Sequence, residues 1–166
     1  MQVKLHQTLY ILILVTVLGA YSNAEDNPSI EGAYVLQSRV LANGSVLKPP
    51  EVEGIYTLTR DYVNFNIVQR NDEGKVFSVS MMAKNKLTNE EYYQELVYMV
   101  INDEIGGNGA SYNFEKKSGA SPVKITDGKI EFLHPVDKTI YLSFEGDKLT
   151  ATRADGSYTA NWVKVK

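Results

Sequence analysis

His134 is the residue whose type best suits acid–base chemistry in this sequence, because an imidazole exchanges a proton near neutral pH. It is a candidate general base, or a donor that polarises a bound ligand. The alternative is a histidine at the end of a strand, satisfied by solvent or by a backbone carbonyl. No other histidine follows residue 24. We therefore assign no catalytic residue, and His134 is the one candidate.

Composition excludes several other kinds of site. The chain has no cysteine, which excludes disulfides, thiolate nucleophiles, iron–sulfur clusters and cysteine zinc sites. One histidine without clustered carboxylates is a poor zinc site. The glycine-rich segment 106–109 lacks the Gly-Lys-Ser/Thr ending of a phosphate loop, and Asp103 and Glu104 do not match the EF-hand pattern. We expect no metal and no cofactor.

Aromatic side chains are the second chemical resource. A tyrosine inside a barrel can stack on a flat ligand and hydrogen-bond its polar edge. The alternative is ordinary packing between neighbouring strands. The residues chosen as interior, ligand-binding positions are Tyr34, Phe65, Tyr112, Phe132 and Trp162.

Charge limits the possible partners. The formal net charge is −3, and no basic cluster indicates a nucleic-acid partner. The arginines are expected on solvated faces, although one placed inside a barrel could hold a carboxylate through two hydrogen bonds. They are Arg39, Arg60, Arg70 and Arg153.

Short antiparallel strands are predicted to position these residues. Turn signals recur along the chain, and the runs between them are rich in Val, Ile, Thr, Tyr and Phe, which favours strands. Several runs alternate in a way that indicates one buried face. The turn signals include Asn43-Gly44, Glu53-Gly54, Asp127-Gly128 and Asp155-Gly156, and one alternating set is Val63, Phe65, Ile67 and Gln69.

One segment departs from this pattern. Thr88 and Glu91 have the spacing of a capping box, in which the hydroxyl accepts from the backbone N–H three residues later. Tyr92 and Leu96 follow at helical spacing. These features predict a short helix over residues 89–96. Residues 97–101 could extend it or begin a strand, because β-branched side chains favour strands.

Residues 1–24 are predicted to form a secretory signal peptide. Lys4 gives a positive start, an apolar run extends from Leu9 to Leu18, and Ser22 and Ala24 supply the small residues of a cleavage site. The run is shorter than the roughly 20 apolar residues that span a membrane. We therefore expect cleavage after Ala24, a secreted or periplasmic protein, no stable membrane insertion, and one domain over residues 25–166.

That domain resembles the bacterial lipocalin-like domains. Gly32-Ala33-Tyr34 is similar to the Gly-x-Trp strand of the family, with Tyr34 at the position of its usual tryptophan. Thr88 and Glu91 resemble the start of its helix, and Trp162 resembles the tryptophan of its closing strand. The resemblance implies an all-β, antiparallel up-and-down β-barrel of about eight to ten strands with one short helix.

This fold favours a binding module that captures a small hydrophobic or aromatic molecule in an internal cavity, because barrel mouths are recurrent ligand sites. Two alternatives stay open. One is a barrel enzyme, of the cyclase, isomerase or hydratase type, which would act on a hydrophobic substrate and would need a buried acid or base such as His134. The other is a barrel that binds a protein through its loops, which an exposed apolar patch at one rim would favour.

Overall fold

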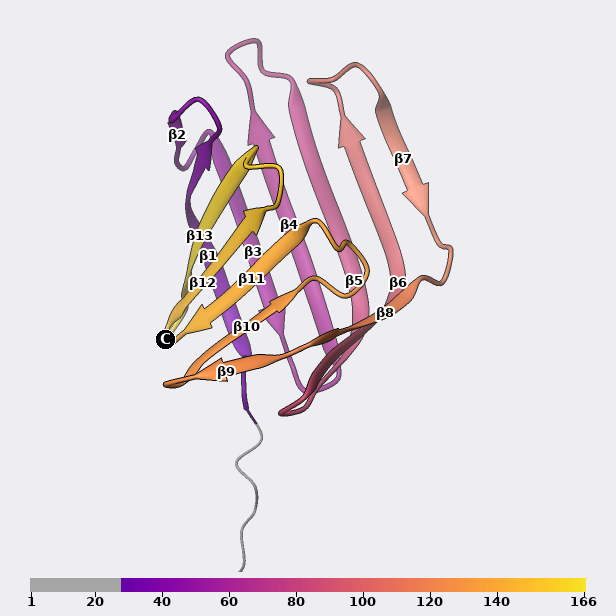
Figure 1. The fold of residues 1–166 in the computed structure, drawn as a ribbon. Helices are drawn as coiled ribbons and strands as arrows, with labels where there is room; N and C mark the ends of the chain where they lie inside the picture. Colours follow the sequence, from indigo (N-terminus) through magenta and orange to yellow (C-terminus); the bar gives the residue numbers. More distant parts are fainter. Residues whose placement is uncertain (1–27) are drawn as a thin grey trace, which may run out of the picture.

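The chain folds into one curled antiparallel sheet (Figure 1). The structure, a computed structural model, describes residues 28–166. The predicted signal peptide, residues 1–24, lies outside the described residues. Within residues 28–166 the sheet contains 13 strands and there is no helix. No helix in this range is therefore available to cross a membrane.

Consecutive strands pair in an up-and-down order, β7-β6-β5-β4-β3-β1-β13-β12-β11-β10-β9, so the first strand and the last are neighbours. The sheet curls into a half-barrel, as Figure 1 shows. The strands are β1 (Gly32–Leu41), β2 (Val46–Leu47), β3 (Val52–Leu58), β4 (Tyr62–Arg70), β5 (Val76–Leu87), β6 (Glu91–Asp103), β7 (Gly109–Asn113), β8 (Ser118–Pro122), β9 (Lys124–Thr126), β10 (Lys129–Leu133), β11 (Ile140–Glu145), β12 (Lys148–Arg153) and β13 (Tyr158–Lys164).

The all-β antiparallel fold is confirmed, and the strand number exceeds the expected eight to ten because some strands are short or interrupted. β7 and β8 pair with different parts of β6 and together form one interrupted edge. Predicted turns at Asn43-Gly44, Asp127-Gly128 and Asp155-Gly156 all connect strands. The turn predicted at Glu53-Gly54 is wrong, because both residues lie within β3 and pair with β4.

The predicted helix over residues 89–96 is also wrong, because these residues form the turn into β6 and its first half. The backbone N–H of Glu91 donates to Thr88 Oγ1 at 3.0 Å, as in a helix cap, but the Thr88 N–H donates back to the Glu91 carbonyl at 2.9 Å. This second bond closes a hairpin between β5 and β6.

A β-bulge explains the misleading spacing in β6. Met82 pairs with Tyr98 but Ala83 pairs with Leu96, so Val97 is an extra residue. The inward-facing apolar residues on the two sides of Val97, Leu96 and Met99, are therefore three positions apart, which is also a helical spacing. The polar Gln94, fully buried between Tyr92 and Leu96, hides the remaining alternation.

A second bulge, in β1, changes which side chains point inward. Leu36 pairs with Trp162 and Arg39 pairs with Ala160. Leu36 and Arg39 are three positions apart on β1, whereas their partners are two positions apart on β13. Alternation beyond the bulge is therefore reversed. Arg39, which strict alternation from Leu36 would direct outward, lies on the inner face with Ala160 and lines the interior.

Inner-face aromatic side chains form two groups. Tyr92 and Phe132 have ring centroids 4.4 Å apart, Phe132 lies 5.7 Å from Phe144, and Phe144 lies 5.8 Å from Tyr34. This group lies at the end of the half-barrel where β6 pairs with β8, because Tyr92 is opposite Ser121. Its members are buried and fill that end.

The two edges of the sheet come close at this same end. β8, on one edge, lies near β10, which is the neighbour of the short strand β9 at the other edge. A Cβ on Gly119 of β8 would lie 2.2 Å from the carbonyl oxygen of Pro135. Only glycine permits this backbone approach. No strand pairing joins β8 to β10 in the described chain, and the edges remain unjoined along β7.

Candidate functional site

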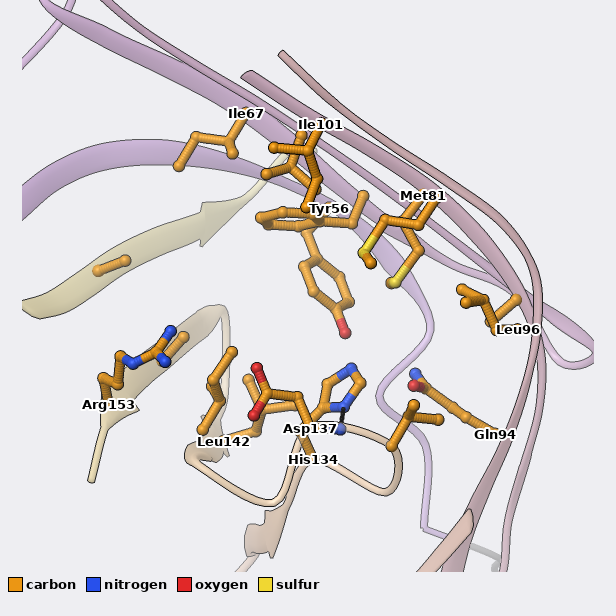
Figure 2. A pocket seen from close by; sticks show the side chains of 18 of the residues that line it. Tyr56, Ile67, Met81, Gln94, Leu96, Ile101, His134, Asp137, Leu142 and Arg153 are labelled. Carbon is orange, nitrogen blue, oxygen red and sulfur yellow. Dashed lines mark hydrogen bonds between the residues drawn. The ribbon is translucent and has the colours of Figure 1, made fainter. Parts of the chain in front are cut away.

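A cavity of about 700 Å³ lies beyond the first aromatic group, on the concave side of the sheet. Its volume is within the range of about 300–1,000 Å³ that is usual for small-molecule sites. Figure 2 shows apolar side chains from several strands around it. They include Ile67, Val79, Met81, Leu96, Ile101 and Leu142.

The second aromatic group forms part of this wall. Tyr56 lies 5.4 Å from Phe65 and 6.2 Å from Trp162 between ring centroids, and Phe65 and Trp162 are 5.8 Å apart. All three line the cavity. Edge-to-face and tilted arrangements of this kind suit the positive edge and negative face of aromatic rings.

Several buried polar atoms of the wall have no hydrogen-bond partner in the described chain. They are the Tyr56 hydroxyl, Gln94 Oε1, Trp162 Nε1 and Arg39 Nε. Gln94 Nε2 donates to the Tyr92 hydroxyl at 2.9 Å, which leaves the amide oxygen unused. An unpaired buried polar group costs roughly 1–3 kcal/mol, so unpaired atoms concentrated around one cavity call for an explanation.

His134 lies at the polar side of the cavity and is buried. Its Nδ1 accepts a hydrogen bond of 2.9 Å from the backbone N–H of Asp137. Nδ1 is therefore unprotonated, and in the neutral ring the proton must be on Nε2. In Figure 2 the second ring nitrogen points to the side where the Tyr56 hydroxyl lies. Burial lowers the pKa of His134 to about 4, partly opposed by Asp137.

Charged residues gather where the segment between β10 and β11 meets the cavity. Burial acts to raise the pKa of Asp137, but hydrogen bonds from Thr139 and the nearby charges of His134 and Arg153 outweigh it, and the pKa is lowered. Lys138 Nζ donates to Ser121 Oγ at 2.7 Å, which ties this segment to β8. The cavity rim is therefore polar and its depth is apolar.

The five predicted ligand-binding residues lie in three different environments in the structure. Phe65 and Trp162 line the cavity. Tyr34 and Phe132 are buried in the aromatic group at the closed end and are not among the lining residues. The interior placement of Tyr112 is wrong: its side chain is 67% exposed, because its neighbour Asn113 takes the inner position opposite Met99.

Sequence reasoning missed three of the polar lining residues. Tyr56 lies two positions after Gly54 and on the same face of β3. It was missed because a turn was predicted at Gly54. Gln94 was assigned to a helix, and Arg39 to a solvated face. A search for strand patterns that tolerate one inserted residue would have found Arg39 and Gln94.

As a group these residues can form hydrogen bonds with a molecule in the cavity. The neutral His134 offers an N–H donor, the Tyr56 hydroxyl offers a donor, and Gln94 Oε1 offers an acceptor. Burial raises the pKa of Tyr56, so its hydroxyl stays protonated at neutral pH. Within residues 28–166 no group of three potential metal-ligating side chains comes together.

Comparison of the chain with protein-family models, with curated proteins and with solved structures finds no match.

Proposed function

We propose that this protein binds a small hydrophobic or aromatic molecule inside its half-barrel, as a lipocalin-like binding module that is exported. The observation that carries the proposal is the cavity of about 700 Å³, which is lined by apolar and aromatic side chains and has polar atoms without partners. A ligand would cover the apolar wall and supply the missing hydrogen bonds.

The geometry of His134 favours binding over the alternative of an enzyme. A general base needs a free lone pair facing the substrate. The lone pair of Nδ1 is occupied by the Asp137 N–H, so the ring presents Nε2–H as a donor instead. Such a donor can orient a carbonyl or hydroxyl group of a ligand. Protein binding through the loops stays a prediction.

Fluorescence with N-phenyl-1-naphthylamine, an uncharged aromatic probe, tests this proposal. The purified protein is expected to bind the probe saturably at a single site and to show quenching of Trp162, the only tryptophan in the chain. Val79→Phe, which adds bulk to the cavity wall, should weaken binding. Ile55→Phe is the matched control, because Ile55 is 41% exposed and does not line the cavity.

The absence of saturable binding in the natural protein would contradict the proposal, as would equal binding by the two variants while both remain folded by circular dichroism. Native mass spectrometry of protein purified from its host gives an independent result, because a retained small molecule adds a discrete mass that denaturation removes.

A further inference from the structure

Arg39 has an unusual environment for an arginine. Its Nη1 donates to Gln69 Oε1 at 3.2 Å, and its Cζ lies 4.1 Å from the centre of the Tyr158 ring. Its Nε is buried without a partner. The protein thus holds one side of the guanidinium with a neutral amide and an aromatic face. Nε therefore has a free N–H within residues 28–166, and the edge that it forms with Nη2 has the shape that suits a carboxylate.

The charge of Arg39 also lacks compensation. None of the ion pairs within residues 28–166 includes it. Burial lowers the pKa of Arg39, Tyr158 opposes this effect, and the positive charge of Arg153 adds to it. Arg39 is half-buried, and partial removal of an unpaired charge from water is costly. An anion beside Arg39 would relieve that cost.

Most of the other charged side chains that line the cavity are also positive. Four cationic side chains line it, and Asp137 is the single carboxylate among the lining residues. The chain as a whole carries a net charge of −3. Lys117 and Arg153 are paired with Glu115 and Asp155, at 3.2 and 3.3 Å. Arg39 and Lys138 form no ion pair within residues 28–166, so the cavity keeps an excess of positive charge, which attracts anions. The cationic residues are Arg39, Lys117, Lys138 and Arg153.

From these observations we infer that the ligand is an amphiphilic anion, whose carboxylate accepts hydrogen bonds from Arg39 while its apolar body fills the cavity between β4, β5 and β6. This inference rests on the proposed function and specifies the class of ligand. Tyr56 and His134 would then face the apolar body or a second polar group farther along the ligand.

Competition against bound N-phenyl-1-naphthylamine tests the inference, with dodecanoate and dodecan-1-ol as competitors that share a chain length and differ in charge. In about 0.15 M salt, which screens distant charges, dodecanoate should bind about tenfold more tightly than the alcohol, the scale of one charge-assisted hydrogen bond. Arg39→Gln should remove that preference, because it should weaken binding of dodecanoate about tenfold more than binding of dodecan-1-ol, with the affinity for the probe measured in the same variant. Arg39→Lys should retain part of it, because the charge remains but the planar fork is lost.

Arg60→Gln is the matched control, since Arg60 is exposed, does not line the cavity and changes the net charge equally. It should keep the preference for dodecanoate. Equal displacement by acid and alcohol in the natural protein would overturn the inference and leave the proposed function standing. A preference that survives in Arg39→Gln, or that Arg60→Gln also removes, would overturn the role of Arg39. Failure of the probe itself to bind would overturn the proposed function.

Discussion

Gly54 and Trp162 approach so closely that no larger residue fits at position 54. A Cβ there would lie 2.8 Å from Cη2 of the indole and 2.9 Å from the carbonyl oxygen of Asn66. The glycine that resembled a turn signal instead sets the position of a ring that lines the cavity. Trp162 is itself buried, at 2% exposure.

Gly54→Ala is therefore expected to destabilise the protein. Replacing glycine can stabilise a fold by about 0.4–1 kcal/mol through the unfolded chain, but overpacking costs about 1–3 kcal/mol and should exceed this gain. Urea unfolding gives the free energy, and Trp162 emission reports displacement of the ring. Ile55→Ala, on the outer face of the same strand, should leave the emission unchanged. If Gly54→Ala left both the free energy of unfolding and the Trp162 emission unchanged, the close approach of Gly54 and Trp162 would not require glycine.

Tyr56→Phe should separate stability from binding. Its hydroxyl is buried without a partner, so its removal should leave the free energy of unfolding unchanged or raise it by up to about 1 kcal/mol. If the hydroxyl serves a ligand with a polar group near it, affinity for that ligand should fall. Urea unfolding and probe competition measure the two effects.

Tyr34→Phe is the matched comparison for this experiment. The Tyr34 hydroxyl donates to the Ile30 carbonyl at 3.1 Å, and its loss should destabilise the protein by about 1 kcal/mol. If Tyr56→Phe destabilised the protein more than Tyr34→Phe, the Tyr56 hydroxyl could not be unpaired.

His134 should make the fold less stable as the pH falls. Its pKa is about 4 in the folded protein, below the ordinary value of 6.5 expected for the unfolded chain. Above pH 6.5 both states are neutral at this site. Between pH 6.5 and 4 the unfolded chain takes up the proton first, so stability decreases, by at most about 3 kcal/mol.

His134→Gln should lose this part of the pH dependence, because glutamine does not titrate. Urea unfolding of both proteins at pH 7, 5.5 and 4.5 measures the difference and cancels the contribution of the carboxylates they share. Titration of the His134 ring signals by NMR is a direct check. A midpoint near 6.5 in the folded protein would contradict the buried, neutral assignment.

Much of the fold could be predicted from the sequence, because alternation is a direct result of the pleated strand. The set Val63, Phe65, Ile67 and Gln69, predicted to share one face of a strand, does so and faces inward: three are buried or line the cavity, and Gln69 contacts the inner Arg39. The closing strand behaves likewise, with Tyr158, Ala160 and Trp162 along the cavity.

The candidate site was predicted less well, for one physical cause. Bulges at Val97 and before Ser38 each reverse the inward and outward faces of a strand. A bulge has no strong sequence signature, and a single added residue exchanges the two faces. Arg39 and Gln94 were missed on this account. Tyr112 shows the related limit that the register of an edge strand depends on its partner.

Since the sheet edges are not joined along β7, residues from both edges face the same space: Asn113 ends β7, and Val136 follows β10. A ligand bound there would contact both sheet edges and would link them through these contacts. Occupancy would accordingly raise the melting temperature with ligand concentration. Under the proposed function, binding a ligand would therefore also stabilise the fold.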